Sequence, residues 1–194
     1  FERIHDFQAI QLVFEMLRRR VGSPLSYSSL ARDAGCAPNT IKRYVGILES
    51  LFIVFRVTPF HRNIGRSLLK EPKIYFYDTG LVLGDDGVKM ENLAAISLLK
   101  HSNWVEDSKG KKCSLQTLRT KEKKEVDFVI VEEDEPKLIV EVKLSDTTIS
   151  PALLYFHKKY GLDATQLVKN ITTERMVEGV ALRRAANFLR ELAL

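Results

Sequence analysis

Two strongly apolar segments that lie close together constrain the fold of this chain more than any other feature. Residues 125–132 and 137–144 are rich in Val and Ile, and the acidic, turn-forming segment 133–136 (Glu-Asp-Glu-Pro) separates them. Short apolar segments joined by such a turn are typical of a β-hairpin. The sequence therefore predicts two neighbouring antiparallel strands in the second half of the chain.

Charged residues interrupt both of these predicted strands. Asp127 lies within the first segment, and Glu141 and Lys143 lie near the end of the second. Because side chains alternate along a strand, Glu141 and Lys143 should share one face, and the hairpin can bring Asp127 beside Glu141. Two carboxylates that converge on a sheet are costly unless a cation joins them. The alternative is that these charges are ordinary polar groups on exposed edge strands.

Such a carboxylate pair has a definite chemical preference. Hard oxygen ligands favour Mg²⁺ or Mn²⁺. A lysine two residues from a ligand, as Lys143 is from Glu141, could orient a water molecule or stabilise charge on a phosphate.

The sequence around the hairpin predicts an α/β (α+β) domain over residues 81–194. A helix is expected over about 90–101, strands over 114–120, 125–132 and 137–144, a helix over 151–160, a strand over 164–168 and a final helix over 177–192. From residue 90 the order is α-β-β-β-α-β-α, which predicts a mixed sheet flanked by helices.

Residues 1–80 predict a winged helix-turn-helix domain. After a helix over 5–20, helices over about 26–35 and 39–51 are joined by a Gly-containing turn, and β-rich segments at 52–57 and 73–77 would form the wing. The candidate DNA contacts are Asn39, Thr40, Lys42 and Arg43 on the second helix of the motif, and Arg62 and Arg66 in the wing. The alternative is a winged helix that binds protein, or packs against another module of the same polypeptide.

Net charge and cysteine content indicate which kind of binding partner and which cellular compartment to expect. The chain carries a net charge of +5, and residues 1–70 hold 11 Lys/Arg against 5 Asp/Glu. This basic first third favours a polyanionic partner such as DNA, although a solvated basic helix face explains it as well. The two cysteines are far apart and favour a reducing cytoplasm. No apolar run approaches the ~20 residues that span a bilayer, so no membrane partner is expected.

The acidic pattern resembles a known nuclease superfamily. Asp127, a hairpin and then Glu141-Val142-Lys143 are similar to the PD-(D/E)xK (restriction-endonuclease-like) superfamily, whose common core is also α-β-β-β-α-β. This resemblance implies Glu91, Asp127 and Glu141 as ligands of Mg²⁺ (or Mn²⁺), and Asp127, Glu141 and Lys143 as the catalytic set. The residue before Asp127 is Val126, so the proline that names the superfamily is absent.

A narrower resemblance covers nearly the whole chain. The segments 48–54, 73–81, 91–92, 125–128 and 141–143 are similar to the C-terminal region, of unknown function, of many prokaryotic AAA-type ATPases. In that family an ATPase module with a P-loop comes first. This chain contains no GxxxxGK[ST] and begins inside a helical pattern without Met, so we expect the ATPase module to precede it in the same polypeptide.

The sequence leaves three functional hypotheses, of which the first follows from the nuclease resemblance. The first is Mg²⁺-dependent hydrolysis of phosphodiester bonds in DNA, as by an endodeoxyribonuclease. The second is a non-catalytic DNA- or protein-binding module that serves the ATPase. The third is a structural or regulatory domain that mediates assembly, including assembly as an oligomer or as half of a toxin–antitoxin-like pair. A divalent ion is required only by the first, and salt-sensitive DNA affinity is expected of a DNA binder.

Overall fold

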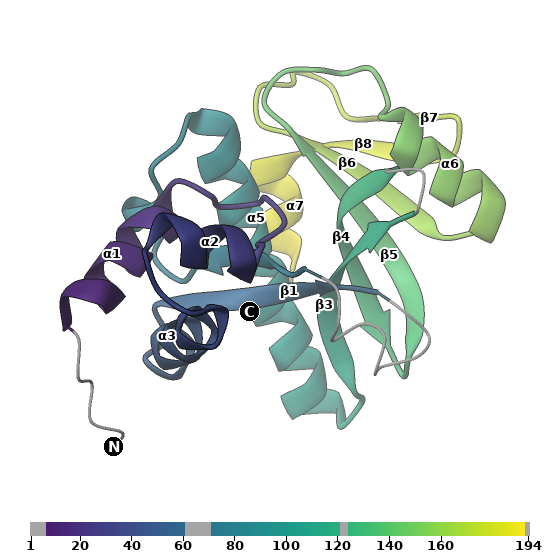
Figure 1. The fold of residues 1–194 in the computed structure, drawn as a ribbon. Coiled ribbons are helices and arrows are strands. Elements are labelled where there is room, and N and C mark those ends of the chain that lie inside the picture. Colours follow the sequence, from purple (N-terminus) through teal and green to yellow (C-terminus); the bar gives the residue numbers. More distant parts are fainter. Residues whose placement is uncertain (1–6, 61–70, 121–123, 193–194) are drawn as a thin grey trace.

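Figure 1 shows the computed structural model of the chain, which describes residues 7–60, 71–120 and 124–192. Its helices are α1 (Phe7–Arg18), α2 (Tyr27–Asp33), α3 (Pro38–Ser50), η1 (Thr79–Leu81, a 3₁₀ helix), α5 (Asp86–Lys109), α6 (Pro151–Tyr160) and α7 (Ala185–Glu191). Its strands are β1 (Val54–Pro59), β2 (Lys73–Phe76), β3 (Cys113–Arg119), β4 (Glu125–Glu132), β5 (Glu135–Lys143), β6 (Asp163–Val168), β7 (Arg175–Val177) and β8 (Val180–Arg184). The mixed α/β class predicted from the sequence is confirmed.

The strands form one mixed sheet in the order β2-β1-β3-β4-β5-β6-β8-β7. The predicted hairpin is confirmed, because β4 and β5 pair antiparallel with Phe128 opposite Val140. Strand β5 also pairs parallel with β6, which places Glu141 beside Gln166. Strand β5 is therefore an interior strand, and the alternative that Glu141 lies on an exposed edge strand is wrong.

The sheet continues across residue 80, where the sequence predicted a domain boundary. Strand β1 pairs antiparallel with β2, with Val54 opposite Phe76, as expected of the wing. However, β1 also pairs parallel with β3, with Thr58 opposite Gln116 and Pro59 opposite Thr117. The strands of the N-terminal part are therefore built into the same sheet as those that follow.

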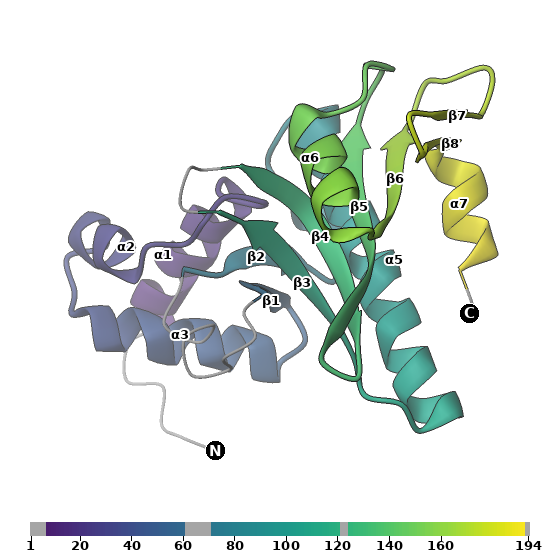
Figure 2. The ribbon, with the colours of Figure 1, turned by 90° about the vertical axis from the view of Figure 1, so that its right-hand side faces the viewer.

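Helices cover both faces of this sheet. Helix α5 packs against β2, β3, β4 and β5, and α6 packs against β4, β5 and β6 on the other face, as Figure 2 shows. Helices α1 to α3 lie together beside the β1–β2 end of the sheet (Figure 1). One hydrophobic core joins α1, α3 and α5 to the sheet, and a second lies beneath α6.

Helix α5 is longer than the predicted helix over 90–101. It runs for 24 residues, because the Asp85 side chain accepts a hydrogen bond from the Val88 N–H at its start and Gly110 ends it in the left-handed conformation. Polar residues in its first and last turns concealed these extensions. Neither α5 nor any other described helix combines the length and apolar character that crossing a lipid bilayer requires.

The predicted final helix over 177–192 is wrong. Residues 175–184 form the antiparallel pair β7–β8, and only Ala185–Glu191 is helical. Glu178 and Gly179 both have positive φ angles, 50° and 85°, which suit a two-residue hairpin turn. Within β8 the buried residues Val180 and Leu182 alternate with more exposed neighbours, which is the period of a strand.

Candidate active site

Glu141 and Lys143 lie at the carboxyl end of β5. Lys143 Nζ is 2.8 Å from Glu141 Oε1, so the two side chains share a face as alternation predicted. The Glu141 side chain is only 8% exposed, whereas that of Lys143 is 36% exposed. A buried carboxylate is thus joined to a lysine that reaches solvent.

Asp127 lies beside this pair at a break in the β3–β4 pairing. Gln116 pairs with Val129 and Leu118 with Val126, so two residues of β4, Asp127 and Phe128, stand opposite one residue of β3. This arrangement is that of a β-bulge, which turns a side chain away from strict alternation. Asp127 Oδ2 then accepts a hydrogen bond of 2.9 Å from the Val142 N–H, between Glu141 and Lys143.

The third predicted ligand, Glu91, reaches the site from α5. The Tyr75 hydroxyl of β2 donates a hydrogen bond of 2.6 Å to Glu91 Oε1. The loop after α1 also approaches this carboxylate, because a Cβ added to Gly22 would lie 2.8 Å from Glu91 Oε1. Glu91 is therefore enclosed by β2 and by the loop that contains Gly22.

Gly22 offers a direct test of this close approach. Its φ of +74° is unfavourable for residues with a side chain, and an added Cβ would also press on Glu91. We expect Gly22→Ala to lower the free energy of unfolding by about 1–2 kcal/mol. Urea denaturation measures the change.

Gly46→Ala is the control, since nothing lies within 4 Å of a Cβ there and the position is inside α3. It should leave the free energy of unfolding unchanged or raise it by up to about 1 kcal/mol. Equal effects of the two variants would contradict the expectation.

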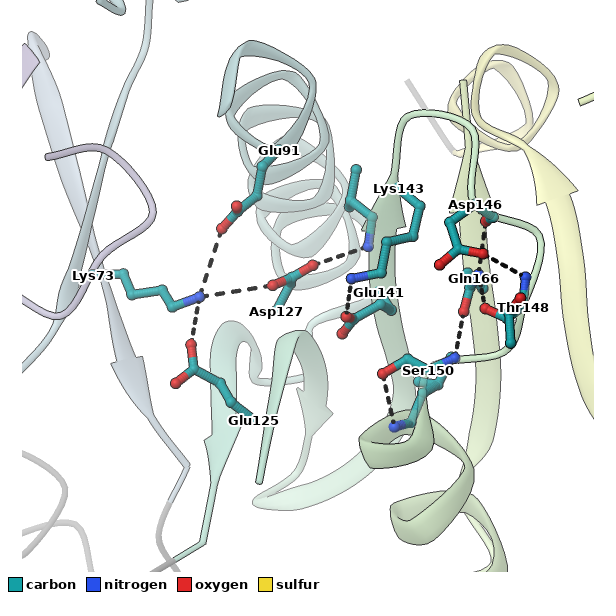
Figure 3. Close-up of polar contacts among 12 residues, drawn as sticks. Lys73, Glu91, Glu125, Asp127, Glu141, Lys143, Asp146, Thr148, Ser150 and Gln166 are labelled. Atoms are coloured by element: carbon teal, nitrogen blue, oxygen red, sulfur yellow. Dashed lines mark hydrogen bonds and ion pairs between the residues drawn. The ribbon is translucent and has the colours of Figure 1, made fainter. Parts of the chain in front are cut away.

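Lys73, at the start of β2, is a site residue that the sequence analysis missed. Its Nζ lies 2.7 Å from Glu125 Oε1, 3.6 Å from Glu91 Oε1 and 3.8 Å from Asp127 Oδ1 (Figure 3). Its side chain is only 5% exposed. The sequence showed only that this lysine directly precedes the apolar segment Ile74-Tyr75-Phe76, and nothing in that segment specifies its acidic partners.

Burial dominates the electrostatics of the acidic residues. It raises the pKa of Glu91 to about 7, and repulsion by Asp127 adds to this effect. Burial likewise raises the pKa of Asp127 and of Glu141. For Lys73, burial lowers the pKa, but attraction by the surrounding carboxylates outweighs it and leaves the pKa above its ordinary value. The site therefore brings several acidic groups close together, and the Lys73 ammonium stays protonated among them.

The carboxylate oxygens of the site have one property that suits a divalent cation, but the acidic side chains are not already arranged around a single point. Within the described residues, Glu141 Oε2 is buried and has no hydrogen-bond partner, so this oxygen is free to act as a ligand of a cation. Asp127 is close enough to raise the pKa of both Glu91 and Glu141 by repulsion. In the same part of the chain, however, no three Asp, Glu, His or Cys side chains are already gathered as a metal site. Asp127 and Glu141 adjoin, whereas Lys73 lies between Glu91 and Asp127.

A buried glutamine fixes the loop that follows Lys143. The Gln166 side chain on β6 accepts a hydrogen bond from the Ser150 N–H at 2.8 Å. Its amide donates to the carbonyls of Asp146 and Thr148 at 3.1 and 2.9 Å (Figure 3). All three bonds lie within this one loop, so Gln166 holds the exit from β5 next to the candidate site. The sequence analysis did not identify this residue.

Four of the six candidate DNA contacts lie on α3. Asn39, Lys42 and Arg43 are exposed and Thr40 is partly buried. The Lys42 ammonium lies 5.7 Å from the centre of the Tyr27 ring, and the Arg43 guanidinium lies 5.4 Å from that of Tyr44. The other two candidates, Arg62 and Arg66, lie outside the described residues.

In comparison with known proteins, both parts of the chain match family models that have no assigned function. Residues 1–89 match a domain of unknown function, DUF8612, and residues 86–183 match a second one, DUF4143. Because the second match covers half of the chain, the chain belongs to the DUF4143 family.

Curated relatives are also uncharacterized. One protein of Mycobacterium bovis and one of Mycobacterium tuberculosis are each 39% identical to this chain over 80 residues, which cover 39% of this chain and 18% of the relative. The matched region is thus less than a fifth of the length of these relatives. Among solved structures there is no significant match.

Proposed function

We propose that this chain is the C-terminal region of an AAA-type ATPase and that its site hydrolyses phosphodiester bonds of DNA with Mg²⁺ or Mn²⁺. The observation that carries the proposal is the meeting of Asp127, Glu141 and Lys143 on two paired strands, where a buried carboxylate oxygen of Glu141 has no hydrogen-bond partner among the residues that the structure describes. Buried carboxylates that converge repel each other unless a cation joins them, so a site that keeps them is typical of cation binding.

In this proposal, Asp127 and Glu141 hold the ion, and Glu91 completes the set from α5. A bound Mg²⁺ supplies Lewis acidity toward a phosphate and lowers the pKa of a coordinated water. Lys143 reaches solvent beside Glu141, where it can orient the attacking water and donate to a phosphate oxygen. The hydrogen bond from the Val142 N–H keeps Asp127 aligned with the Glu141 carboxylate.

The rest of the chain is assigned parts that agree with this activity. We take residues 1–80 as a winged helix, because α3 follows α2 after a short connection and β1 pairs antiparallel with β2. The α-β-β-β-α-β order from α5 to β6 agrees with a restriction-endonuclease-like domain. The much greater length of the relatives agrees with a further ATPase module in the same polypeptide.

Calorimetric titration of Mn²⁺ tests the proposed ion site. The wild-type chain should bind Mn²⁺, and the Asp127→Ala/Glu141→Ala double variant should not, because it lacks both strand carboxylates. The variant's circular dichroism spectrum must match that of the wild type for the comparison to hold. Equal binding by the two proteins would refute the proposed ligands, and absence of binding by the wild type would refute the nuclease function.

A second candidate function is a non-catalytic DNA- or protein-binding module. It is favoured by Lys73, whose ammonium already neutralises part of the acidic charge without a metal ion. A chain that binds DNA less tightly as the salt concentration rises, but that neither binds Mn²⁺ nor cleaves DNA, would decide for this alternative.

A further inference from the structure

The environment of Lys73 has the character of a cation-binding site that is filled by the protein itself. Three carboxylates, those of Glu91, Glu125 and Asp127, come within 2.7 to 3.8 Å of its ammonium. These acids come from α5 and β4, whereas Lys73 comes from β2. Figure 3 shows the ammonium between them.

Two of these three carboxylates are also proposed metal ligands. Glu91 and Asp127 belong to the set completed by Glu141, whose Oε2 is buried and without a hydrogen-bond partner among the described residues. An ammonium and a divalent cation a few ångströms apart repel each other strongly where water is excluded. The two cations therefore compete for the same oxygen atoms.

We propose that Lys73 is a built-in counter-ion that competes with the divalent cation for Glu91 and Asp127 and so sets the ion affinity of the site. This inference rests on the proposed ion site. Lys73 is thus a positioning residue that stabilises the acidic cluster when no metal ion is present. Because it comes from β2, the part of the chain before residue 80 takes part directly in controlling the site.

The burial of Lys73 and its contact with Glu125 distinguish it from other lysines near the site. Its side chain is almost completely buried, so its charge is poorly screened by solvent, in contrast to the exposed Lys89 two residues before Glu91. Its shortest contact, 2.7 Å, is with Glu125, which lies outside the proposed metal ligands. Glu125 can therefore hold the ammonium when the ion takes the other two carboxylates.

The test is calorimetric titration of Mn²⁺ alone into the whole chain and matched variants. Lys73→Met keeps the length of the side chain and removes its charge, and it should bind Mn²⁺ at least about tenfold more tightly than the wild type. Lys73→Arg keeps the charge and should bind no more tightly than the wild type. Lys89→Met removes an exposed charge two residues before Glu91 in the chain and should change the affinity by less than about twofold.

A double variant separates local competition from a change in net charge. Lys73→Met/Glu125→Gln removes the ammonium together with its closest carboxylate, which preserves the net charge and protects the fold if Lys73→Met alone is unstable. It should also bind Mn²⁺ more tightly than the wild type. In addition, Mn²⁺ should raise the Tm of both variants more than that of the wild type, because a tighter ligand stabilises the folded state more.

Each outcome decides the inference. Tighter Mn²⁺ binding by both Lys73→Met variants than by the wild type supports it. Equal affinity of the wild type and both variants overturns the inference and leaves the proposed ion site intact. Absence of Mn²⁺ binding in every protein overturns the inference together with the proposed nuclease function.

Discussion

Replacing Lys143 with alanine is expected to reduce DNA cleavage by at least about 100-fold while the fold persists. Lys143 is the lysine of the site that reaches both solvent and the buried carboxylate of Glu141, at 2.8 Å. In the proposed mechanism its ammonium orients a water and stabilises charge on the phosphate, and alanine can do neither. Conversion of supercoiled plasmid to nicked and linear forms in the presence of Mg²⁺ or Mn²⁺ measures the loss.

Lys137→Ala is the matched control for this experiment. Lys137 lies on the same strand, β5, but its side chain is exposed near the hairpin turn, far along the strand from Glu141. The control should cleave at the wild-type rate, and both variants should give the wild-type circular dichroism spectrum. If Lys143→Ala cleaves as fast as the wild type, the lysine has no role in catalysis.

The local parts of this site could be predicted from sequence. Glu141 and Lys143 are two residues apart, and period-two alternation alone places them on one face of β5. The acidic turn between β4 and β5 then brings Asp127 close to them. These predictions depend on short-range geometry, which the order of residues largely determines.

Features that depend on long-range packing escaped the sequence analysis. Lys73 meets Asp127 only because β1 pairs parallel with β3, whose partner residues come 58 positions later in the chain. The break in register at Asp127 and Phe128 arises from the pairing of β4 with β3. In neither case does a residue's own neighbourhood in the chain specify its partner, because the partner is chosen by the assembled sheet.

The error at the C-terminus has a different cause. Ala181, Ala185 and Phe188 recur at intervals of four and three residues, which is the spacing of one amphipathic helix. The structure divides them between β8 and α7, since Val180 and Leu182 complete the sheet beside β6. A short apolar segment satisfies either periodicity, and pairing with β6 decides in favour of the strand.

Phe128→Ala is expected to lower the free energy of unfolding by about 3–5 kcal/mol, in a single transition that includes both parts of the chain. Phe128 is fully buried, and its ring centre lies 5.5 Å from that of Tyr75. Tyr75 in turn stacks on Phe55 at 5.8 Å. These rings come from β4, β2 and β1, so the cavity left by alanine would weaken the connection between the strands before residue 80 and those after it.

Urea denaturation followed both by far-ultraviolet circular dichroism and by fluorescence of the single tryptophan, Trp104, measures this effect. Trp104 lies in α5, whereas circular dichroism also reports α1 to α3, so coincident transitions indicate one cooperative unit. Phe7→Ala is the control, because that ring is 73% exposed and its loss should change stability by no more than about 0.5 kcal/mol. Two separate unfolding transitions, of which Phe128→Ala shifts only the one at higher urea concentration, would contradict a shared folding unit. Lys73 would then reach the acidic residues through an interface that can open while the sheet around Asp127 and Glu141 stays folded.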